Sequence, residues 1–387
     1  MKSVEIFAGA GGLAIGAHQA GIICNVLLDS SVGVCETLRA NAGRGIAPMS
    51  SAQIVQSDVR DIKFSDFSNG CDIVMGGPPC QPFSQGGLRR NIADKRNMFP
   101  EAVRALHEIR PKAFLFENVK GIATGSSRNY AEFVRLQLQN PELGVAIKAL
   151  DFDEQLAKLE DAATAGSGSG SMQYNVIMHA ANAADYGVPQ KRDRVFFIGF
   201  RSDLHLEWHF PEETHSAVSL AHDQGQFGTY WERHGVRKSE RLITRIPRDG
   251  DPALNRLPWT TVRDALSDLG EPLKAVGHRN SALQHELVLG ARSYRGHTGS
   301  PFDQPSKALK AGVNGVPGGE NMLRRFDGSV RYFSVRECAR LQTFPDQYRF
   351  EGVWSEQMRQ IGNAVPCSMA EKILLSMKET FAGQTHK

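Results

Sequence analysis

The chain has 387 residues and a mass of 42.5 kDa, enough for one large or two medium domains. Its hydrophobic content of 41% and charged content of 22% are typical of a globular protein, and no run of 18 apolar residues could span a membrane. The net charge of +3 is unevenly distributed, because residues 231–331 contain 17 Lys and Arg against 11 Asp and Glu. This excess favours a polyanion-binding second half, although an arginine-rich solvated surface would have the same composition.

The N-terminus, "MKSVEIFAGAGG", enters a strand-like run directly and lacks the apolar core and cleavage site of a signal peptide. We therefore expect a cytoplasmic protein. The six cysteines are spread along the chain, with no CxxC pair and no Cys/His spacing typical of zinc. Neither a disulfide framework nor a metal site is expected.

Short apolar runs alternate with helical patterns over the first 200 residues. The expected strands are 4–7, 23–28, 53–56, 71–75, 113–116, 174–179 and 194–200, and the clearest helices are 12–20, 32–41 and 99–109. Continuous apolar strands that alternate with helices predict an α/β fold with a doubly wound, mostly parallel sheet. Ligands of such sheets bind at the carboxyl ends of the strands.

The alternation fades from about residue 201, and Arg, His, Gly and Pro become frequent. This change predicts a second, smaller, irregular domain. Helical patterns return at 334–344 and at 368–381. The run "AGSGSGS" at 165–171 is a flexible linker by composition, which does not tell whether it is natural or engineered.

A glycine loop, "IFAGAGGLAIG", follows the first expected strand. Gly9, Gly11 and Gly12 allow a tight turn and a close approach to a ligand at the start of the next helix. Asp29 and Asp58 follow the second and third strands, where one acid can bind ribose hydroxyls and the other an adenine amino group. The spacing also satisfies the dinucleotide fingerprint, so a nicotinamide oxidoreductase is an alternative, as are glycines that only shape a turn.

The stretch "GGPPCQPFS" at 76–84 places one thiol, Cys80, in a stiffened loop after the fourth strand. A nucleophilic cysteine needs a fixed, exposed position, which the two glycines and two prolines favour over a buried core thiol.

Two further polar groups end or begin strands. Glu117 stands in "ENV" at the end of the fifth strand, where a carboxyl group is well placed for acid chemistry, although an Asx-type turn is the more common interpretation of "ENV" alone. Arg192 and Arg194, in "QKRDR", lie on one face of an extended segment and could hold a base carbonyl or a phosphate, or form a charged strand entrance.

The ordered set of these motifs resembles the DNA (cytosine-5) methyltransferase family of bacterial type. The set also includes "DKRNMF" at 94–99, "RYFSVRECARLQTFPD" at 331–346 and "QIGNAVP" at 360–366. The resemblance covers residues 1–200 and 326–387, and residues 201–325 occupy the family's target-recognition segment. It implies a methyltransferase fold with a catalytic and cofactor-binding domain at 1–200, a target-recognition domain at 201–325 and a return segment at 326–387 that completes the catalytic domain.

The resemblance also implies roles for the catalytic residues. Cys80 would attack C6 of a cytosine, so that C5 takes a methyl group. Glu117 would bond the N3 and amino edge of the base, and Arg192 and Arg194 would match the family's arginine pair, with Arg194 at the cytosine O2. The cytosine must be flipped out of the base stack for this chemistry.

S-adenosyl-L-methionine is the implied cofactor, with S-adenosyl-L-homocysteine as its product. The residues that the resemblance assigns to it are Phe7, Ala8, Gly9, Gly11, Gly12, Asp29, Asp58, Val59, Gly77, Pro79, Asn363, Ala364 and Val365. Ser30 and Ser31 depart from the family pattern after Asp29, so adenine packing can differ here.

The implied partner is double-stranded DNA, with a cognate restriction endonuclease as a further candidate. The DNA-binding candidates are Gln81, Ser84, Arg233, Arg237, Lys238, Arg241, Arg245, Arg292, Arg295, Lys307 and Lys310, of which most would contact phosphates. We expect a monomer that is cytoplasmic and nucleoid-associated, without a membrane partner. A tRNA cytosine-5 methyltransferase of the same superfamily and a non-catalytic DNA-binding paralogue remain alternatives, and the recognition sequence cannot be derived.

Overall fold

The computed structural model describes residues 1–79, 96–165, 172–225, 228–242, 250–274, 283–295, 297–311 and 321–383. The chain forms two compact units. Unit 1 contains Met1–Ala181, Asp193–Phe210 and Ile373–Lys387, and unit 2 contains Asn182–Arg192 and Pro211–Lys372. Within the described ranges, no helix is long and apolar enough to cross a membrane.

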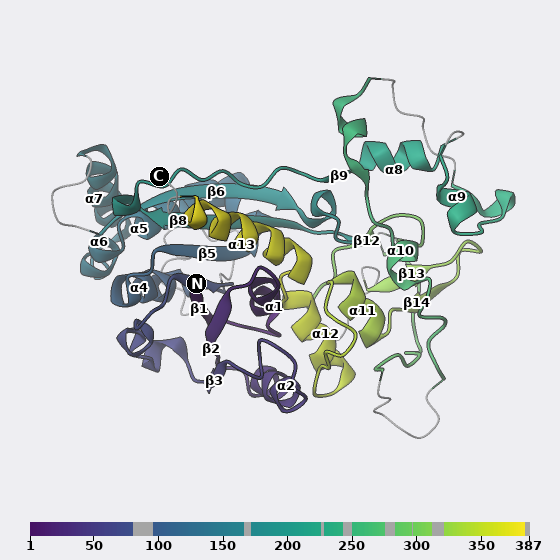
Figure 1. The fold of residues 1–387 in the computed structure, drawn as a ribbon, viewed down its shortest axis with the longest axis horizontal. Helices are drawn as coiled ribbons and strands as arrows, with labels where there is room; N and C mark the ends of the chain where they lie inside the picture. The colour runs from purple at the N-terminus through teal and green to yellow at the C-terminus, as the bar shows by residue number, and fades with distance from the viewer. Residues whose placement is uncertain are drawn as a thin grey trace. The chain divides into compact units, whose positions relative to one another are not determined.

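A seven-stranded sheet forms the centre of unit 1, in the order β3-β2-β1-β4-β5-β8-β6 (Figure 1). Its strands are β1 (Lys2–Ile6), β2 (Ile23–Asp29), β3 (Gln53–Gln56), β4 (Ile73–Gly76), β5 (Ala113–Val119), β6 (Tyr174–Asn182) and β8 (Asp193–Arg201). The pairs β1–β2, β2–β3, β1–β4 and β4–β5 are parallel, whereas β5 and β8 are antiparallel. All seven expected strands are confirmed, and so is the mostly parallel α/β fold.

The helices of unit 1 follow the sheet strands along the chain. They are α1 (Gly12–Gln19), α2 (Val32–Gly43), α4 (Phe99–Ile109), α5 (Arg128–Gln139), α6 (Pro141–Ala146), α7 (Phe152–Ala165) and the part of α13 (Cys367–Ala382) from Ile373 onward. Short 3₁₀ turns lie at η1 (Val59–Asp61), η2 (Phe64–Phe67), η3 (Lys120–Ala123), η4 (Gly125–Ser127) and η6 (Ser202–Leu204). The expected helices at 12–20, 32–41, 99–109 and 368–381 are confirmed to within two residues.

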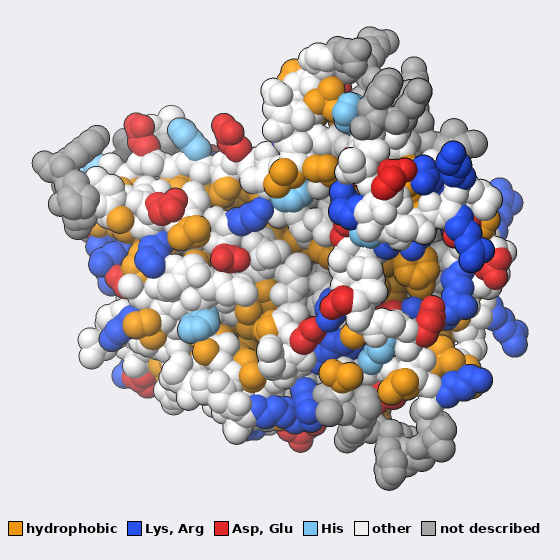
Figure 2. Space-filling view, turned by 45° about the vertical axis from the view of Figure 1, so that its right-hand side comes forward, with side chains coloured by type: hydrophobic (Ala, Val, Ile, Leu, Met, Phe, Trp, Pro, Cys, Tyr) orange, Lys and Arg blue, Asp and Glu red, His pale blue; other side chains and the backbone are white. Residues whose placement is uncertain are grey.

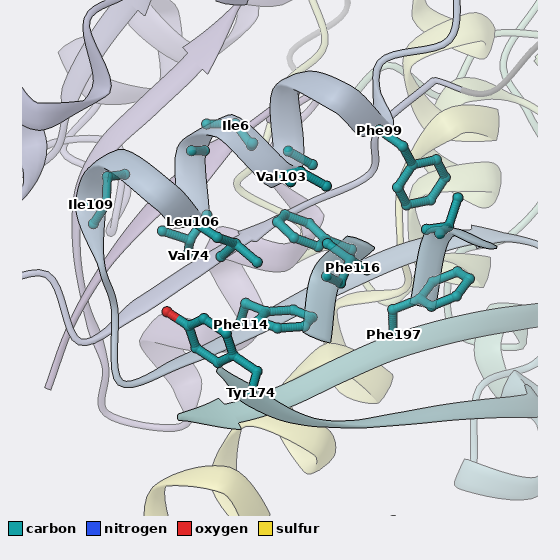
Figure 3. Close-up of a cluster of buried hydrophobic side chains, with 14 of the residues drawn as sticks. Ile6, Val74, Phe99, Val103, Leu106, Ile109, Phe114, Phe116, Tyr174 and Phe197 are labelled. Atoms are coloured by element: carbon teal, nitrogen blue, oxygen red, sulfur yellow. The ribbon is translucent and has the colours of Figure 1, made fainter. Parts of the chain in front are cut away.

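One apolar core fills the face of the sheet beneath α4 (Figure 3). Helix α4 places Phe99, Val103 and Leu106 on one side, the spacing of an amphipathic helix, and all three are buried. Alternate residues of the strands meet them, and Phe114 and Tyr174 pack edge to face at 5.2 Å between ring centroids. Each fully buried large side chain of this kind contributes about 1.5–3 kcal/mol, so this face anchors the sheet.

Unit 2 is built from short elements, as expected for the irregular second part. Its helices are α8 (Ala217–Asp223), α9 (Tyr230–Arg233), α10 (Val262–Leu266), α11 (Val335–Leu341) and α12 (Trp354–Asn363), with 3₁₀ turns η5 (Ala183–Tyr186), η7 (Lys238–Glu240) and η8 (Pro252–Asn255). Its strands are β7 (Gln190–Lys191), β9 (His215–Ser216), β10 (Leu257–Pro258), β11 (Ser300–Pro301), β12 (Ser306–Lys307), β13 (Met322–Arg324) and β14 (Val330–Tyr332). They pair as β9–β10, β7–β12 and β11–β13–β14. The helix expected at 334–344 is confirmed as α11.

The expected return segment at 326–387 is divided between the two compact units. Residues 326–372 belong to unit 2, and only 373–387 belong to unit 1. The expected domains are defined by function, so their division at 200 and 325 stays a prediction. The run at 166–171 lies outside the described residues.

Gly76 marks a place where the backbone permits no side chain. It ends β4 opposite Ile6 of β1, and an added Cβ would overlap the carbonyl oxygen of Ile6. This close approach explains the first glycine of "GGPP" and brings the end of β4 against the end of β1.

We predict that Gly76→Ala lowers the free energy of unfolding by about 3 kcal/mol, because a backbone oxygen cannot move aside as a side chain can. Denaturant unfolding followed by circular dichroism would measure the loss. Gly121→Ala is the matched control, since no described residue lies within 4 Å of its added Cβ. Equal stability of the two variants would contradict the prediction.

Candidate active site

The glycine loop that follows β1 has an unusual backbone conformation. Phe7, Gly9 and Gly11 all have positive φ angles, of 56°, 52° and 76°. Gly11 is the N-cap of α1 and no side chain caps the helix there, so amides at the start of the helix can face a ligand. An added Cβ at Gly9 would meet no described residue within 4 Å. The loop therefore has room for a group that approaches its backbone closely.

Asp29, at the end of β2, connects the glycine loop to the turn that follows β2. Its Oδ2 accepts a hydrogen bond from the Gly9 amide at 2.9 Å, and its Oδ1 accepts one from the Ser31 amide at 2.8 Å. The carboxylate is half-buried, so it is fixed in place and still reaches the edge of the sheet.

Asp58 lies two residues beyond β3, the next strand of the same sheet. Its carboxylate receives two hydrogen bonds from the Arg60 guanidinium and one from the Arg60 amide. These bonds lower the pKa of Asp58 to about 2, so it is an anion at neutral pH. Val59, which follows it, is buried.

An open glycine loop at a helix N-terminus, with carboxylates after the next two strands, fits an adenosyl cofactor. The amides suit a carboxylate, and the acids suit ribose hydroxyls and an amino group. Among the described residues, no group of three or more His, Cys, Asp and Glu side chains could hold a metal ion.

Glu5, the last residue but one of β1, is a buried acid that sequence reasoning did not single out. The side chain is 1% exposed, and the described residues offer its Oε2 no hydrogen-bond partner. Burial is the main cause that raises the pKa of Glu5 well above its ordinary value; the charge of Asp29 raises it further, and a hydrogen bond from the Ala14 backbone lowers it. Glu5 is therefore a buried acid in contact with the first turn of α1, and its burial favours the protonated form.

The described part of the "GGPP" segment is held by polar contacts from two directions. The Asn118 side chain donates to the Pro78 carbonyl at 2.9 Å, and the Met98 amide donates to the Pro79 carbonyl at 3.0 Å. An added Cβ at Gly77 would lie 3.4 Å from Glu117 Oε2. These contacts place Glu117 next to the residues that precede Cys80. Cys80 itself lies outside the described residues, as do Gln81, Ser84 and Arg245.

Glu117 and Arg194 form a close ion pair in unit 1. Arg194 Nε lies 2.6 Å from Glu117 Oε1, in a geometry outside that of a hydrogen bond, and the two side chains are 13% and 9% exposed. The antiparallel pairing of β5 with β8 brings them together, because Val119 is paired with Arg194 two residues beyond Glu117. Lys120 and Asp193, which follow Glu117 and precede Arg194 in the chain, form a more exposed salt bridge at 3.3 Å. Acid and cation are thus held at one strand end.

Arg192, in contrast, lies in unit 2 and is 1% exposed. Its guanidinium donates to the carbonyls of Leu309, Gly362 and Ala364 at 2.7–3.0 Å. The two arginines of "QKRDR" therefore have different partners. Arg194 forms an ion pair with Glu117, and Arg192 donates to backbone carbonyls. A direct catalytic contact of Arg192 stays a prediction.

The expected C-terminal cofactor residues lie at the end of α12. Asn363 is exposed, whereas Ala364 and Val365 are buried. Gln342, a buried amide in the same unit, donates to the Ala364 carbonyl, and the buried Gln190 side chain donates to Gln342. Neither glutamine was assigned a role from the sequence. Their position inside the motifs "QKRDR" and "RECARLQ" could have indicated a structural role, since a buried side-chain amide needs a hydrogen-bond partner.

The DNA-binding candidates divide into two groups in unit 2. Arg233 and Arg241 form ion pairs with Asp223 and Glu232, both at 3.2 Å, and Lys307 donates to a threonine hydroxyl. The other described candidates are exposed, and for the first four the described residues provide no side-chain partner; the group is Arg237, Lys238, Arg292, Arg295 and Lys310. Figure 2 shows Lys and Arg side chains scattered among acidic ones over its right-hand part.

Comparison with known proteins identifies the family. The chain matches the family described as C-5 cytosine-specific DNA methylase over residues 1–154 and 167–379. The chain belongs to this family. It is 29% identical to the type II methyltransferase M.NgoPII of Neisseria gonorrhoeae, over 98% of this chain and 96% of that protein. It is 30% identical to M.FnuDI of Fusobacterium nucleatum, over 98% and 95%.

Solved structures support the fold. A putative DNA modification methyltransferase encoded in an E. coli prophage matches with a TM-score of 0.57 and 19% identity, over 99% of both chains. The Dnmt2 methyltransferase of S. pombe matches with a TM-score of 0.57 and 16% identity, over 98% of this chain and 99% of that chain. As a C-5 cytosine-specific DNA methylase, this protein catalyses DNA cytosine-5 methylation, which rules out the nicotinamide oxidoreductase and the non-catalytic paralogue.

We predict that Glu5→Gln stabilises this methylase increasingly as the pH rises. Since burial raises the pKa of Glu5 in the folded chain, the stability linked to its proton is present below about pH 4.5 and is lost as the pH rises toward the raised pKa. The variant has no such loss, because glutamine is neutral at every pH. Denaturant unfolding at pH 5 and pH 8 would show a larger gain at pH 8. A gain independent of pH would contradict the prediction. Glu132→Gln, which changes an exposed side chain of α5, is the control.

Proposed function

We propose that the protein methylates C5 of a flipped-out cytosine in a specific DNA sequence through a covalent adduct of Cys80. The Cys80 thiolate forms a bond to C6, and C5 becomes nucleophilic. S-adenosylmethionine supplies the methyl group when it is bound, and S-adenosylhomocysteine remains. A base then removes the C5 proton, the bond between sulfur and C6 breaks, and the thiolate is restored. The target must leave the base stack for the thiolate to reach it.

Glu117 and Arg194 would act on the base itself. Glu117 would bond the N3 and amino edge and offset the charge that develops as C6 is attacked, and Arg194 would bond O2. The observation that carries the proposal is the position of their ion pair. Glu117 lies beside Gly77, and its neighbour Asn118 holds the Pro78 carbonyl, two residues before the thiol.

The cofactor would lie over the glycine loop. Gly9 and Gly11 would take the close backbone approach, Asp29 the ribose hydroxyls and Asp58 the adenine amino group, which it would share with Arg60. The remaining proposed contacts are Phe7, Ala8, Gly12, Val59, Gly77, Pro79, Asn363, Ala364 and Val365. The space above Gly9 and the uncapped start of α1 support this placement.

Double-stranded DNA would be gripped by unit 2. This unit carries 24 Lys and Arg against 20 Asp and Glu, whereas unit 1 carries 21 against 22. The relatives are named type II methyltransferases, so we further infer that the protein protects a recognition site that a restriction endonuclease would otherwise cut. We also infer that it works as a cytoplasmic, nucleoid-associated monomer.

We predict that Cys80→Ala abolishes methyl transfer and that Glu117→Gln lowers the methylation rate 10²–10³-fold, the usual effect of losing one group that stabilises developing charge. Both variants should still bind S-adenosylhomocysteine. Methylation sequencing of DNA from a methylation-free host, with labelled methyl incorporation into DNA and tRNA, would measure activity and target together. Glu132→Gln, which removes an exposed carboxylate that pairs with Arg135, is the control and should keep full activity. Turnover by Cys80→Ala, or labelling of tRNA alone, would refute the proposal.

We also predict that replacing Arg237, Lys238, Arg292 and Arg295 with alanine weakens DNA binding and flattens its salt dependence. Each lost phosphate contact should reduce the slope of log affinity against log salt by about 0.9. Fluorescence anisotropy with a labelled duplex from 50 to 200 mM salt, roughly the range over which the effect is large, would measure it. Lys2→Ala with Lys112→Ala, two cations at the amino ends of β1 and β5, is the control. An unchanged slope in the fourfold variant would remove these residues from the interface.

A further inference from the structure

Arg192 connects two segments of unit 2 that are far apart in the sequence. One Nη donates to the carbonyl of Leu309 at 3.0 Å. The other donates to Gly362 and Ala364, at 2.7 and 2.9 Å. Because Arg192 is 1% exposed, these are charge-assisted bonds in a buried setting, and their loss would remove a strong donor from each of the three carbonyls.

The two segments also touch through their backbones. We call residues 309–311 with Asn321 the stem, and residues 362–365 the turn. An added Cβ at Gly362 would lie 2.5 Å from the Ala311 amide nitrogen, so the stem crosses the turn where only glycine fits. Asn321 closes the stem, because its side chain accepts from the Lys310 amide and donates to the Lys310 carbonyl, both at 3.1 Å.

Two buried amides extend the same network. The Gln190 side chain accepts from the Leu309 amide at 2.9 Å and donates to the Gln342 side chain at 3.2 Å. Gln342 in turn donates to the carbonyls of Ile361 and Ala364, at 2.7 and 3.2 Å. Arg192 bonds directly to both the stem and the turn, and Gln190 and Gln342 link the two through a second path. These bonds oppose a displacement of one segment relative to the other.

We propose that Arg192 is a positioning residue that couples cofactor binding to DNA binding by making the turn and the stem one rigid body. The inference rests on the proposed function, in which Asn363, Ala364 and Val365 of the turn contact the cofactor. The stem carries Lys310 and follows Lys307, the two DNA-binding candidates nearest to it in the chain. A cofactor that orders the turn thereby orders the stem before DNA arrives.

Arg336 offers a matched control within the same unit. It is also 1% exposed and donates to three carbonyls, those of Leu283, Pro345 and Tyr348, none of which belongs to the stem or the turn. Arg336→Met should cost as much stability as Arg192→Met, because each removes three hydrogen bonds from a buried guanidinium. A comparison of the two variants therefore distinguishes a general loss of stability, which both should show, from a loss of coupling, which only Arg192→Met should show.

The test measures DNA affinity with and without saturating S-adenosylhomocysteine. In the wild type the cofactor product should tighten DNA binding at least about 5-fold, and DNA should tighten binding of the product by the same factor. Arg192→Met should bring this factor close to one, Arg192→Lys should retain part of it, and Arg336→Met should leave it at the wild-type value. Thermal unfolding of each variant would show which ones are folded, and Arg192→Lys decides the matter if Arg192→Met does not fold.

Each other outcome overturns the inference. An unchanged factor in the folded Arg192 variants, or an equal decrease in Arg336→Met, would show that Arg192 has only a general structural role. A wild type that binds both ligands without coupling would overturn the inference and leave the proposed function standing. A wild type that binds neither ligand would overturn both.

Discussion

The pairing of β1 with β2 on one side and β4 on the other determines where the candidate residues of unit 1 lie. Ile6 is paired with Leu28 and with Gly76, so three chain segments leave the sheet side by side. Because the strands are parallel, the glycine loop, Asp29 and the "GGPP" segment all emerge at the carboxyl edge. The absence of a side chain at Gly76 permits this approach, since its Cβ would overlap the Ile6 carbonyl.

Polar side chains then hold the loops that the sheet brings together. Asp29 binds amides of two loops, and Asn118 and the Met98 amide bind the carbonyls of Pro78 and Pro79. Such bonds restrict loops that have little apolar surface to bury, so that a ligand meets groups already in position. Glu5 differs from these side chains, because its buried Oε2 has no hydrogen-bond partner among the described residues.

Buried arginines join distant backbone segments in unit 2, alongside its apolar packing. That packing includes the cluster of Leu220, Tyr230, Trp231 and Val236 and the mutually packed rings of Phe344, Tyr348 and Phe350. Arg192 and Arg336 each donate to backbone carbonyls of segments that are distant in the sequence. These bonds satisfy carbonyls of irregular segments that do not pair in a β-sheet. A unit held in this way depends on single side chains, and a change at one of them reaches every segment that it joins.

The sequence by itself determined the seven sheet strands, the main helices and the family, because apolar periodicity and the order of motifs are local properties of the chain. The resemblance also singled out Glu117 and Arg194, which the structure brings to within 2.6 Å of each other. Only the tertiary structure decided that Arg192, two residues before Arg194, is buried in the other unit, and that burial raises the pKa of Glu5. The partners of a side chain and the pKa of an acid depend on which distant segments pack around them, and residue spacing does not encode that packing.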